Sequence, residues 1–230
     1  MRITVISDTH TKHNQITSSL PGGDLLIHTG DISSMGYQHE IQQFCKWFNS
    51  IDNYETKVFI AGNHDWGFQI EHDTIMQIVD SYKTIDYLQD DLLMIGKENY
   101  DEMLKIWGSP WQPEFYNWAF NLPRQGEELK SKWDMIPMNT DILLTHGPAW
   151  GHLDTIAGQS VPLGCELLSE RIKVVKPKIH VCGHIHTGYG YKFEDGTHFF
   201  NASVLDERYI FTHPPMTFDW NRETNEVTFI

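Results

Sequence analysis

Five short apolar runs along the chain predict buried β-strands. They are Ile3–Ile6, Leu25–Ile27, Val58–Ala61, Ile142–Leu144 and Ile179–Cys182. Each run is almost unbroken in hydrophobicity, which is typical of strands that are buried on both faces and are usually parallel. We therefore expect an α/β fold whose ligand-binding edge lies at the carboxyl ends of these strands.

Helical periodicity separates the early strands. Apolar residues recur at i, i+3, i+4 and i+7 from Ile41 to Phe48, and again from Ile75 to Tyr82. Each stripe predicts a helix with one buried face. The first third of the chain therefore alternates strand and helix, as right-handed βαβ crossovers do.

After residue 84 the predicted strands become shorter and form hairpins. The expected strands are Thr84–Leu88, Leu92–Ile95, Met103–Trp107, Tyr189–Phe193, Thr197–Asn201, Met216–Trp220 and Glu226–Ile230. The turn residues Glu194-Asp195-Gly196 and Asn221–Asn225 close the last two hairpins. This count fits two mixed β-sheets packed as a sandwich and flanked by helices. Because there is no internal repeat, low-complexity tract or linker, we expect residues 1–230 to form a single domain.

The segment Gly108–Gly126 is rich in aromatic residues and is interrupted by prolines, so we expect an irregular loop. Two interpretations of its rings stay open. Trp111 or Tyr116 can stack on a nucleobase, or the rings of the segment simply pack over a sheet face.

Composition and charge narrow the function. The formal net charge of −14 disfavours extended nucleic acid and anionic membranes as partners, since both require a basic surface. We expect a cytoplasmic protein, because the N-terminus does not read as a signal peptide and no apolar stretch is long enough to span a bilayer. The three widely spaced cysteines predict buried, reduced thiols.

Polar clusters follow each of the five apolar runs directly. They are Asp8-Thr9-His10, Gly30-Asp31, Gly62-Asn63-His64-Asp65, Thr145-His146-Gly147 and Gly183-His184-Ile185-His186. In an extended backbone, side chains two residues apart point to the same side, so Asp8 and His10 form one pair and His184 and His186 another. Glycines such as Gly30, Gly62 and Gly183 permit sharp turns after the strands.

These clusters predict a metal centre at one sheet edge. Its candidate ligands are Asp8, His10, Asp31, Asn63, His146, His184 and His186. Imidazole, carboxylate and carboxamide together suit Mn²⁺, with Fe or Zn²⁺ as alternatives. Seven ligands exceed the needs of one ion and suit two ions that share a bridging carboxylate. Such a pair activates a bridging water for in-line attack on a phosphate ester.

His64 and Asp65 are the candidate catalytic residues. An unligated His64 can protonate the leaving alkoxide, and Asp65 can orient the imidazole or raise its pKa. The remaining histidines are interpreted as structural or surface residues, apart from His152, which stays open. They are His13, His28, His39, His72, His180, His198 and His213.

In these blocks the chain resembles the calcineurin-like metallophosphoesterase superfamily. Its signature is DxH, GD, GNH[DE], a lone His and GHxH, in this order. The resemblance implies that Asp8, His10 and His186 hold one metal, that Asn63, His146 and His184 hold the other, and that Asp31 bridges them, with His64 as proton donor or oxyanion stabiliser. It also implies the two-sheet sandwich with the metals at the strand ends.

Further strings are similar to the metallophosphoesterase-domain-containing branch, which is related to class III cyclic nucleotide phosphodiesterases. They include His28-Thr29-Gly30-Asp31, Thr145-His146-Gly147-Pro148 and Asn201-Ala202-Ser203. The resemblance implies hydrolysis of small phosphodiesters, including 2′,3′- or 3′,5′-cyclic nucleotides. Three alternatives stay open: a phosphomonoesterase or protein phosphatase, a nuclease, and a nucleotide-binding or scaffold module without turnover.

Overall fold

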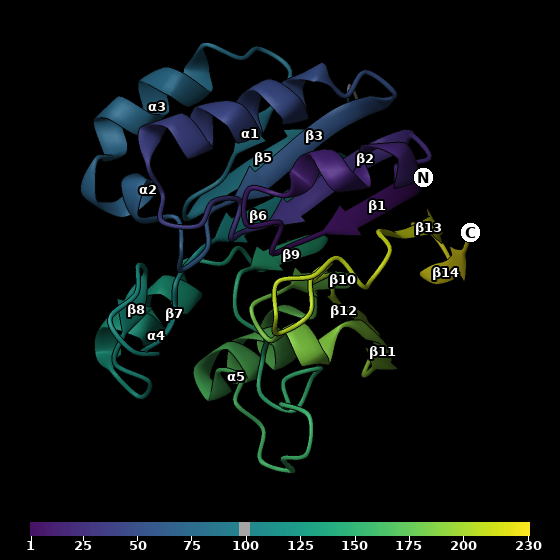
Figure 1. Cartoon of the computed structure of the whole chain (residues 1–230). Coiled ribbons are helices and arrows are strands. Elements are labelled where there is room, and N and C mark those ends of the chain that lie inside the picture. Colours follow the sequence, from purple (N-terminus) through teal and green to yellow (C-terminus); the bar gives the residue numbers. More distant parts are fainter. Residues whose placement is uncertain (97–101) are drawn as a thin grey trace.

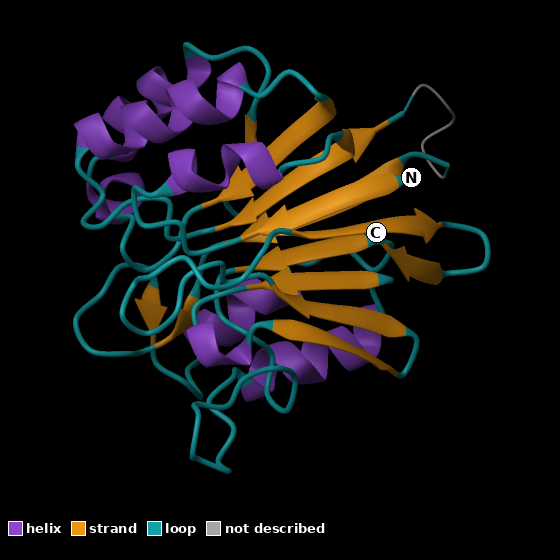
Figure 2. Cartoon of the chain, turned by 45° about the vertical axis from the view of Figure 1, so that its right-hand side comes forward, coloured by secondary structure: helices purple, strands orange, loops and turns teal. Residues whose placement is uncertain are grey.

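The computed structural model describes residues 1–96 and 102–230 and contains two six-stranded sheets (Figures 1 and 2). The first sheet has the order β14-β13-β1-β2-β3-β4. Its strands are β1 (Arg2–Ile6), β2 (Gly23–Thr29), β3 (Tyr54–Ile60), β4 (Asp86–Tyr87), β13 (Met216–Asn221) and β14 (Glu226–Phe229). Strands β1 to β4 are parallel, and β13 and β14 add an antiparallel hairpin beside β1.

The second sheet has the order β11-β12-β10-β9-β6-β5. Its strands are β5 (Asp91–Ile95), β6 (Leu104–Ser109), β9 (Ile142–Thr145), β10 (Ile179–Cys182), β11 (Gly190–Glu194) and β12 (Thr197–Asn201). The four central strands are parallel, and the edge strands β5 and β11 are antiparallel to their neighbours. Both sheets are therefore mixed, as predicted.

Helices cover the outer faces of the sandwich. Helices α1 (Gln38–Ser50), α2 (Trp66–Ile70) and α3 (His72–Asp80), with the 3₁₀ turn η1 (His13–Ser19), cover the first sheet. Helices α4 (Glu127–Asp134) and α5 (Glu166–Val175) cover the second. A further short 3₁₀ turn, η2 (His186–Gly188), follows β10. Each outer layer has its own apolar cluster, and both predicted helical stripes face inward.

The central core lies between the two sheets. Val5 and Ile27 of the first sheet share a fully buried cluster with Ile142, Leu144 and Val181 of the second. Burying β-branched and leucine side chains of this kind stabilises a fold by about 1.5–3 kcal/mol each. The predicted two-layer sandwich is confirmed, and the core holds the carboxyl ends of the central strands at a common edge.

Several local predictions need correction. The expected strand Thr84–Leu88 shortens to the two residues of β4, because β3 pairs with only this part of it. The aromatic segment is not wholly irregular, since β7 (Gln112–Pro113) pairs with β8 (Asn121–Leu122). The cysteines are buried and free, as expected.

Candidate metal centre

The loops after β1, β2, β3, β9 and β10 carry the predicted ligands and meet at one edge of the sandwich. Short backbone hydrogen bonds join them: the Asp8 amide donates to the Gly30 carbonyl at 3.0 Å, and the Gly183 amide donates to the His146 carbonyl at 2.9 Å. Thus β1 is joined to β2, and β9 to β10, at the point where each strand ends.

The two carboxylates lie among the imidazoles. Asp8 Oδ1 is 3.5 Å from His186 Nε2, and Asp31 Oδ2 is 3.5 Å from His10 Nε2 and 3.4 Å from His146 Nε2. Three overlapping groups have potential ligand atoms within 4.8 Å of one another: Asp8, His10 and His186; His10, Asp31 and His64; and Asp8, Asp31 and His146. Asp31 thus lies between the two ends of the ligand set, where a bridging carboxylate is expected.

Backbone strain accompanies this convergence. Asp8, His10, Asp31 and His184 have φ angles of 55°, 39°, 53° and 67°. The left-handed region costs a residue with a Cβ about 1–3 kcal/mol, and such strain persists where surrounding structure enforces it. More than half of the predicted ligands therefore adopt a conformation that the strand ends impose.

The glycines of the motifs leave space for the ligands. A Cβ on Gly62 would lie 2.3 Å from Asp31 Oδ1, and one on Gly183 would lie 2.2 Å from Asp8 Oδ2. Gly30 combines such close contact with a φ of +100°. The expectation of turn glycines therefore holds for Gly30, whereas Gly62 and Gly183 are required because the carboxylates come so close.

Three histidines are oriented by backbone carbonyls. The Nδ1 atoms of His64, His146 and His186 lie 2.8, 2.9 and 2.9 Å from the carbonyl oxygens of Ser34, Thr29 and Asp206. A carbonyl only accepts, so Nδ1 carries the proton in each ring and Nε2 is the second nitrogen left for a ligand or a substrate. None of the three residues that supply these carbonyls is itself a predicted metal ligand.

The remaining contacts fit bound cations. His10 Nε2 is buried and has no hydrogen-bond donor or acceptor. His146 Nε2 faces Asn63 Oδ1 at 2.9 Å and Asp31 Oδ2 at 3.4 Å. Without metal a proton on Nε2 satisfies these oxygens, and a cation bound to the neutral imidazole takes the place of that proton, so these residues fit the predicted metal ligands. His184 lies beside them, with its ring centroid 5.1 Å from that of His146.

Protonation equilibria reflect the same crowding. Burial raises the pKa of Asp8 and Asp31, but the neighbouring histidines outweigh it and hold both pKa values below normal. Burial lowers the pKa of His146 and His186, but Asp31 and Asp8 outweigh it and raise each to about 9. Burial lowers the pKa of His10 to about 4. Without metal, protons on two imidazoles therefore balance the two carboxylates.

Asp65 does not orient the His64 imidazole, which was one of the two roles expected for it. Its carboxylate accepts hydrogen bonds from the amides of Ile32, Ser33 and Gly62 and from the Ser33 hydroxyl, at 2.5–3.2 Å. Orientation of His64 comes instead from the Ser34 carbonyl. Asp65 thus holds together the loops after β2 and β3. Burial, followed by the charge of Asp31, raises its pKa to about 6.

A second set of supporting residues comes from the end of β12 and the segment that follows it. The Ser203 hydroxyl donates to Asp8 Oδ2 at 2.7 Å, and Asn201 Oδ1 accepts from the Ser203 amide at 3.2 Å. Tyr209 lies edge-to-face on His10, with centroids 4.7 Å apart. In the sequence, Asn201-Ala202-Ser203 stands out only through the family resemblance, and Tyr209 does not stand out at all. No local pattern connects these residues with Asp8 or His10.

Buried histidines outside the ligand set support the strand ends. His28 Nε2 lies 2.9 Å from the Thr9 hydroxyl, and His180 Nε2 lies 2.8 Å from the Thr145 hydroxyl. Burial lowers the pKa of each imidazole to about 3, so both are neutral. His152 stacks on Phe199 at 3.9 Å and lies in none of the metal-ligand groups found among the described residues. We therefore interpret His152 as a packing residue.

A pocket of about 430 Å³ adjoins the centre. Its lining includes His10, Asp31, Asn63, His64, Gln112, Glu114, Phe115, Arg124, Ile156, Leu163, His184, His186, Glu207 and Tyr209. Arg124 donates to the carbonyls of Leu163 and Gly164 and to Glu166, and Arg171 donates to the carbonyls of Asp134 and Ile136. Both arginines therefore bind other parts of the chain.

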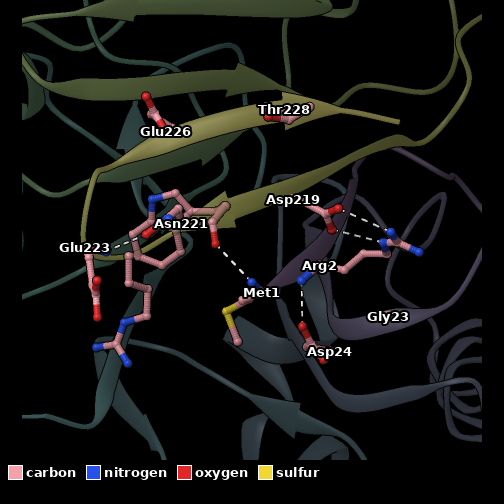
Figure 3. A pocket seen from close by; sticks show the side chains of 11 residues that line it. Met1, Arg2, Gly23, Asp24, Asp219, Asn221, Glu223, Glu226 and Thr228 are labelled. Carbon is pink, nitrogen blue, oxygen red and sulfur yellow. Dashed lines mark hydrogen bonds and ion pairs between the residues drawn. The ribbon is translucent and has the colours of Figure 1, made fainter.

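A larger groove lies at the opposite ends of the strands (Figure 3). Arg2 contacts Asp219 there at 3.1 Å, and the Arg2 amide donates to Asp24 at 2.6 Å. None of the predicted metal ligands lines it. The chemistry is therefore assigned to the pocket at the carboxyl edge.

Comparison with known proteins agrees with this geometry. The family model of the calcineurin-like phosphoesterases matches residues 1–188, which contain every predicted ligand. The chain belongs to the calcineurin-like phosphoesterase family. It is 38% identical over 238 residues to human metallophosphoesterase domain-containing protein 1, covering 95% of this chain and 70% of that protein. The expected family and branch are therefore confirmed.

Solved structures show the same fold at low sequence identity. A protein from Thermus thermophilus aligns with a TM-score of 0.66 and 11% identity over 99% of this chain and 97% of its own. The phosphopantetheinyl hydrolase of Mycobacterium tuberculosis aligns with a TM-score of 0.57 and 15% identity over 90% of each chain.

Membership of the family establishes the general chemistry of this calcineurin-like phosphoesterase. The family is dinuclear and metal-dependent and hydrolyses phosphoesters, and the candidate ligand groups described above match this requirement. Within the described part of the chain, no helix is both long and apolar enough to cross a membrane.

Proposed function

We propose that this protein is a dinuclear metal-dependent phosphodiesterase that acts on small phosphodiesters, including 2′,3′- or 3′,5′-cyclic nucleotides. The observation that supports diesters is the charge of the pocket. Among the described residues that line the pocket, Arg124 is the only Arg or Lys. Its guanidinium is already hydrogen-bonded to Glu166 and to two backbone carbonyls. Glu114 and Glu207 add negative charge. Such a pocket favours a singly charged diester over a doubly charged monoester.

The ligand residues would divide between two ions. Asp8, His10 and His186 would hold one, Asn63, His146 and His184 the other, and Asp31 would be shared. The bound ions would neutralise the phosphoryl oxygens and lower the pKa of the attacking water. The strained backbone and the carbonyl-anchored imidazoles hold these side chains ready for that role.

His64 would supply the proton to the leaving oxygen. Its Nδ1 is bound to the Ser34 carbonyl, which leaves Nε2 as the nitrogen for the substrate. A positioned acid of this kind contributes about 10²–10⁴-fold to rate, with the largest effect on poor leaving groups. His64→Ala should therefore slow alkyl esters far more than nitrophenyl esters while two metals remain bound.

The pocket beside the centre would hold the organic part of the ester. Its volume of about 430 Å³ is within the usual range for small-molecule sites. Phe115 and Leu163 provide apolar lining, and Phe115 lies edge-to-face on His184 with centroids 5.5 Å apart. Gln112 also lines it and has a buried Oε1 without a donor. An apolar wall with few polar groups suits a ring-containing ester such as a nucleotide.

Metal analysis with paired ester substrates tests the proposal. The protein is stripped with chelator, reloaded with Mn²⁺, and assayed on bis(p-nitrophenyl) phosphate, p-nitrophenyl phosphate and cyclic nucleotides. We expect about two metals per chain and a kcat/KM severalfold higher for the nitrophenyl diester than for the monoester. Asp31→Asn should abolish turnover, whereas Asp24→Asn, the same change in the distant groove, should retain it. Preference for the monoester would refute the assignment as a diesterase, and full activity without metal would refute metal dependence.

A further inference from the structure

The aromatic segment between β6 and α4 places Trp118 on the proposed proton donor. The Trp118 and His64 rings are stacked, with centroids 4.0 Å apart and planes at 29°. His10 meets the same imidazole edge-on at 4.7 Å and 88°. The His64 imidazole therefore lies against Trp118 and His10, with Tyr209 farther away at 6.4 Å, in addition to the hydrogen bond from its Nδ1 to the Ser34 carbonyl.

The chain anchors Trp118 to the loop that carries His64. The amide of Ala119 donates to the Asn63 carbonyl at 3.0 Å, and the amide of Phe120 donates to Gln69 Oε1 at 2.6 Å. The two residues after Trp118 are thus bound to the segment 63–69. This explains why the stacked geometry is held although the segment has little regular structure.

Other rings of the segment have different surroundings. Trp111 donates from Nε1 to Asp90 at 2.9 Å and packs on the apolar clusters, and Phe120 is fully buried. Tyr116 is 84% exposed and is not part of the described pocket lining. The packing interpretation therefore holds for Trp111 and Phe120, and neither Trp111 nor Tyr116 lies where a base would stack. Trp118 is the ring that contacts the proposed acid.

We infer that Trp118 is a positioning residue that fixes the plane of the His64 imidazole. One hydrogen bond at Nδ1 holds one atom of the ring but permits the plane to turn about that contact. A stacked indole restricts this turn and keeps Nε2 directed at the leaving oxygen. The inference rests on the proposed role of His64, because Trp118 acts through that residue and has no separate chemistry.

A double-mutant cycle with two classes of ester tests the inference. Trp118→Leu removes the ring, and we expect kcat for an alkyl phosphodiester to fall by about tenfold, with nitrophenyl esters changed less than about twofold. KM and metal content should stay near the wild-type values. In a His64→Ala background the same substitution should have no further effect on the alkyl ester, since residues that act as a unit are not additive.

Two control variants separate positioning from folding. Tyr116→Leu changes an exposed ring of the same segment and should leave the leaving-group dependence unchanged. Trp118→Phe keeps a ring over His64 and should retain most of the alkyl-ester activity. If Trp118→Leu does not fold, Trp118→Met replaces it as the ringless variant, and the comparison with Trp118→Phe is made in the same way.

The outcomes distinguish the inference from the proposed function. Equal losses on both ester classes, or a loss that persists in the His64→Ala background, would overturn the positioning role alone. Absence of a leaving-group effect in His64→Ala would overturn the assignment of the acid, and the inference with it. If Trp118→Leu loses activity only on alkyl esters, and causes no further loss in the His64→Ala background, the positioning role of Trp118 is established.

Discussion

Gly183→Ala should disrupt the metal centre through steric overlap with a ligand. The new Cβ would lie 2.1 Å from Ser7 Oγ and 2.2 Å from Asp8 Oδ2, whereas ordinary contact begins at 3.4 Å. The carboxylate oxygen must therefore move by about 1 Å, which is enough to cost about 10²-fold in a catalytic geometry.

Asp8 has little freedom to make this movement. Its carboxylate accepts from the His184 amide at 3.0 and 3.1 Å and from the Ser203 hydroxyl at 2.7 Å. Overpacking costs about 1–3 kcal/mol, and each hydrogen bond lost by a charged group adds about 1.5–3 kcal/mol. We therefore expect a loss of stability of about 2.5–6 kcal/mol if one such bond breaks.

Metal content and thermal unfolding provide the assay. Purified Gly183→Ala, dialysed against Mn²⁺, should bind about one metal or none, have a lower Tm, and lose at least about 10²-fold in diesterase kcat. Gly147→Ala is the matched control for metal content, because its Cβ would contact Gln112 at 3.5 and 3.6 Å without overlap. Two metals and wild-type turnover in Gly183→Ala would refute the steric reasoning.

Three further predictions concern protons and hydrogen bonds at the same edge. His146 and His186 have pKa values of about 9 in the metal-free protein, and metal binding requires neutral imidazoles. Metal affinity should therefore rise with pH from 7 to 9, and binding at pH 7.5 should release about two protons. Calorimetry in buffers of different ionisation enthalpy measures the number of protons released. A metal affinity that does not change with pH would contradict this prediction. Asp65→Asn turns an amide donor toward backbone donors and should lower the free energy of unfolding by about 3 kcal/mol in urea titrations; an unchanged midpoint would contradict the loop-holding role. Ser203→Ala removes one hydrogen bond from Asp8 and should weaken Mn²⁺ binding by about tenfold, as measured by competition with a chelator. Ser50→Ala changes the last residue of α1, whose hydroxyl donates to the Trp47 carbonyl, and should leave Mn²⁺ binding unchanged.

The sequence by itself indicated the candidate ligands and the strands that carry them. Each apolar run is local, and each polar cluster follows its run directly, so a spacing of a few residues is enough to place Asp8 or His184 at a strand end. Parallel pairing then brings those ends to one edge, which is why the two-sheet sandwich was predictable. The spacing of Leu129, Trp133 and Ile136, at i, i+4 and i+7, also carries a helical signal at α4.

Only the tertiary structure decided how those side chains are held. The Ser34 carbonyl on His64, the Ser203 hydroxyl on Asp8 and the Trp118 ring on His64 join residues that lie far apart in the sequence, by as many as 195 positions. Asp65 likewise bonds to the loop after β2 rather than to its neighbour His64. Periodicity reports which face of an element is buried, but it has no information about which distant backbone or side chain meets that face. These contacts arise when the two sheets pack, and so they are specified by the fold as a whole.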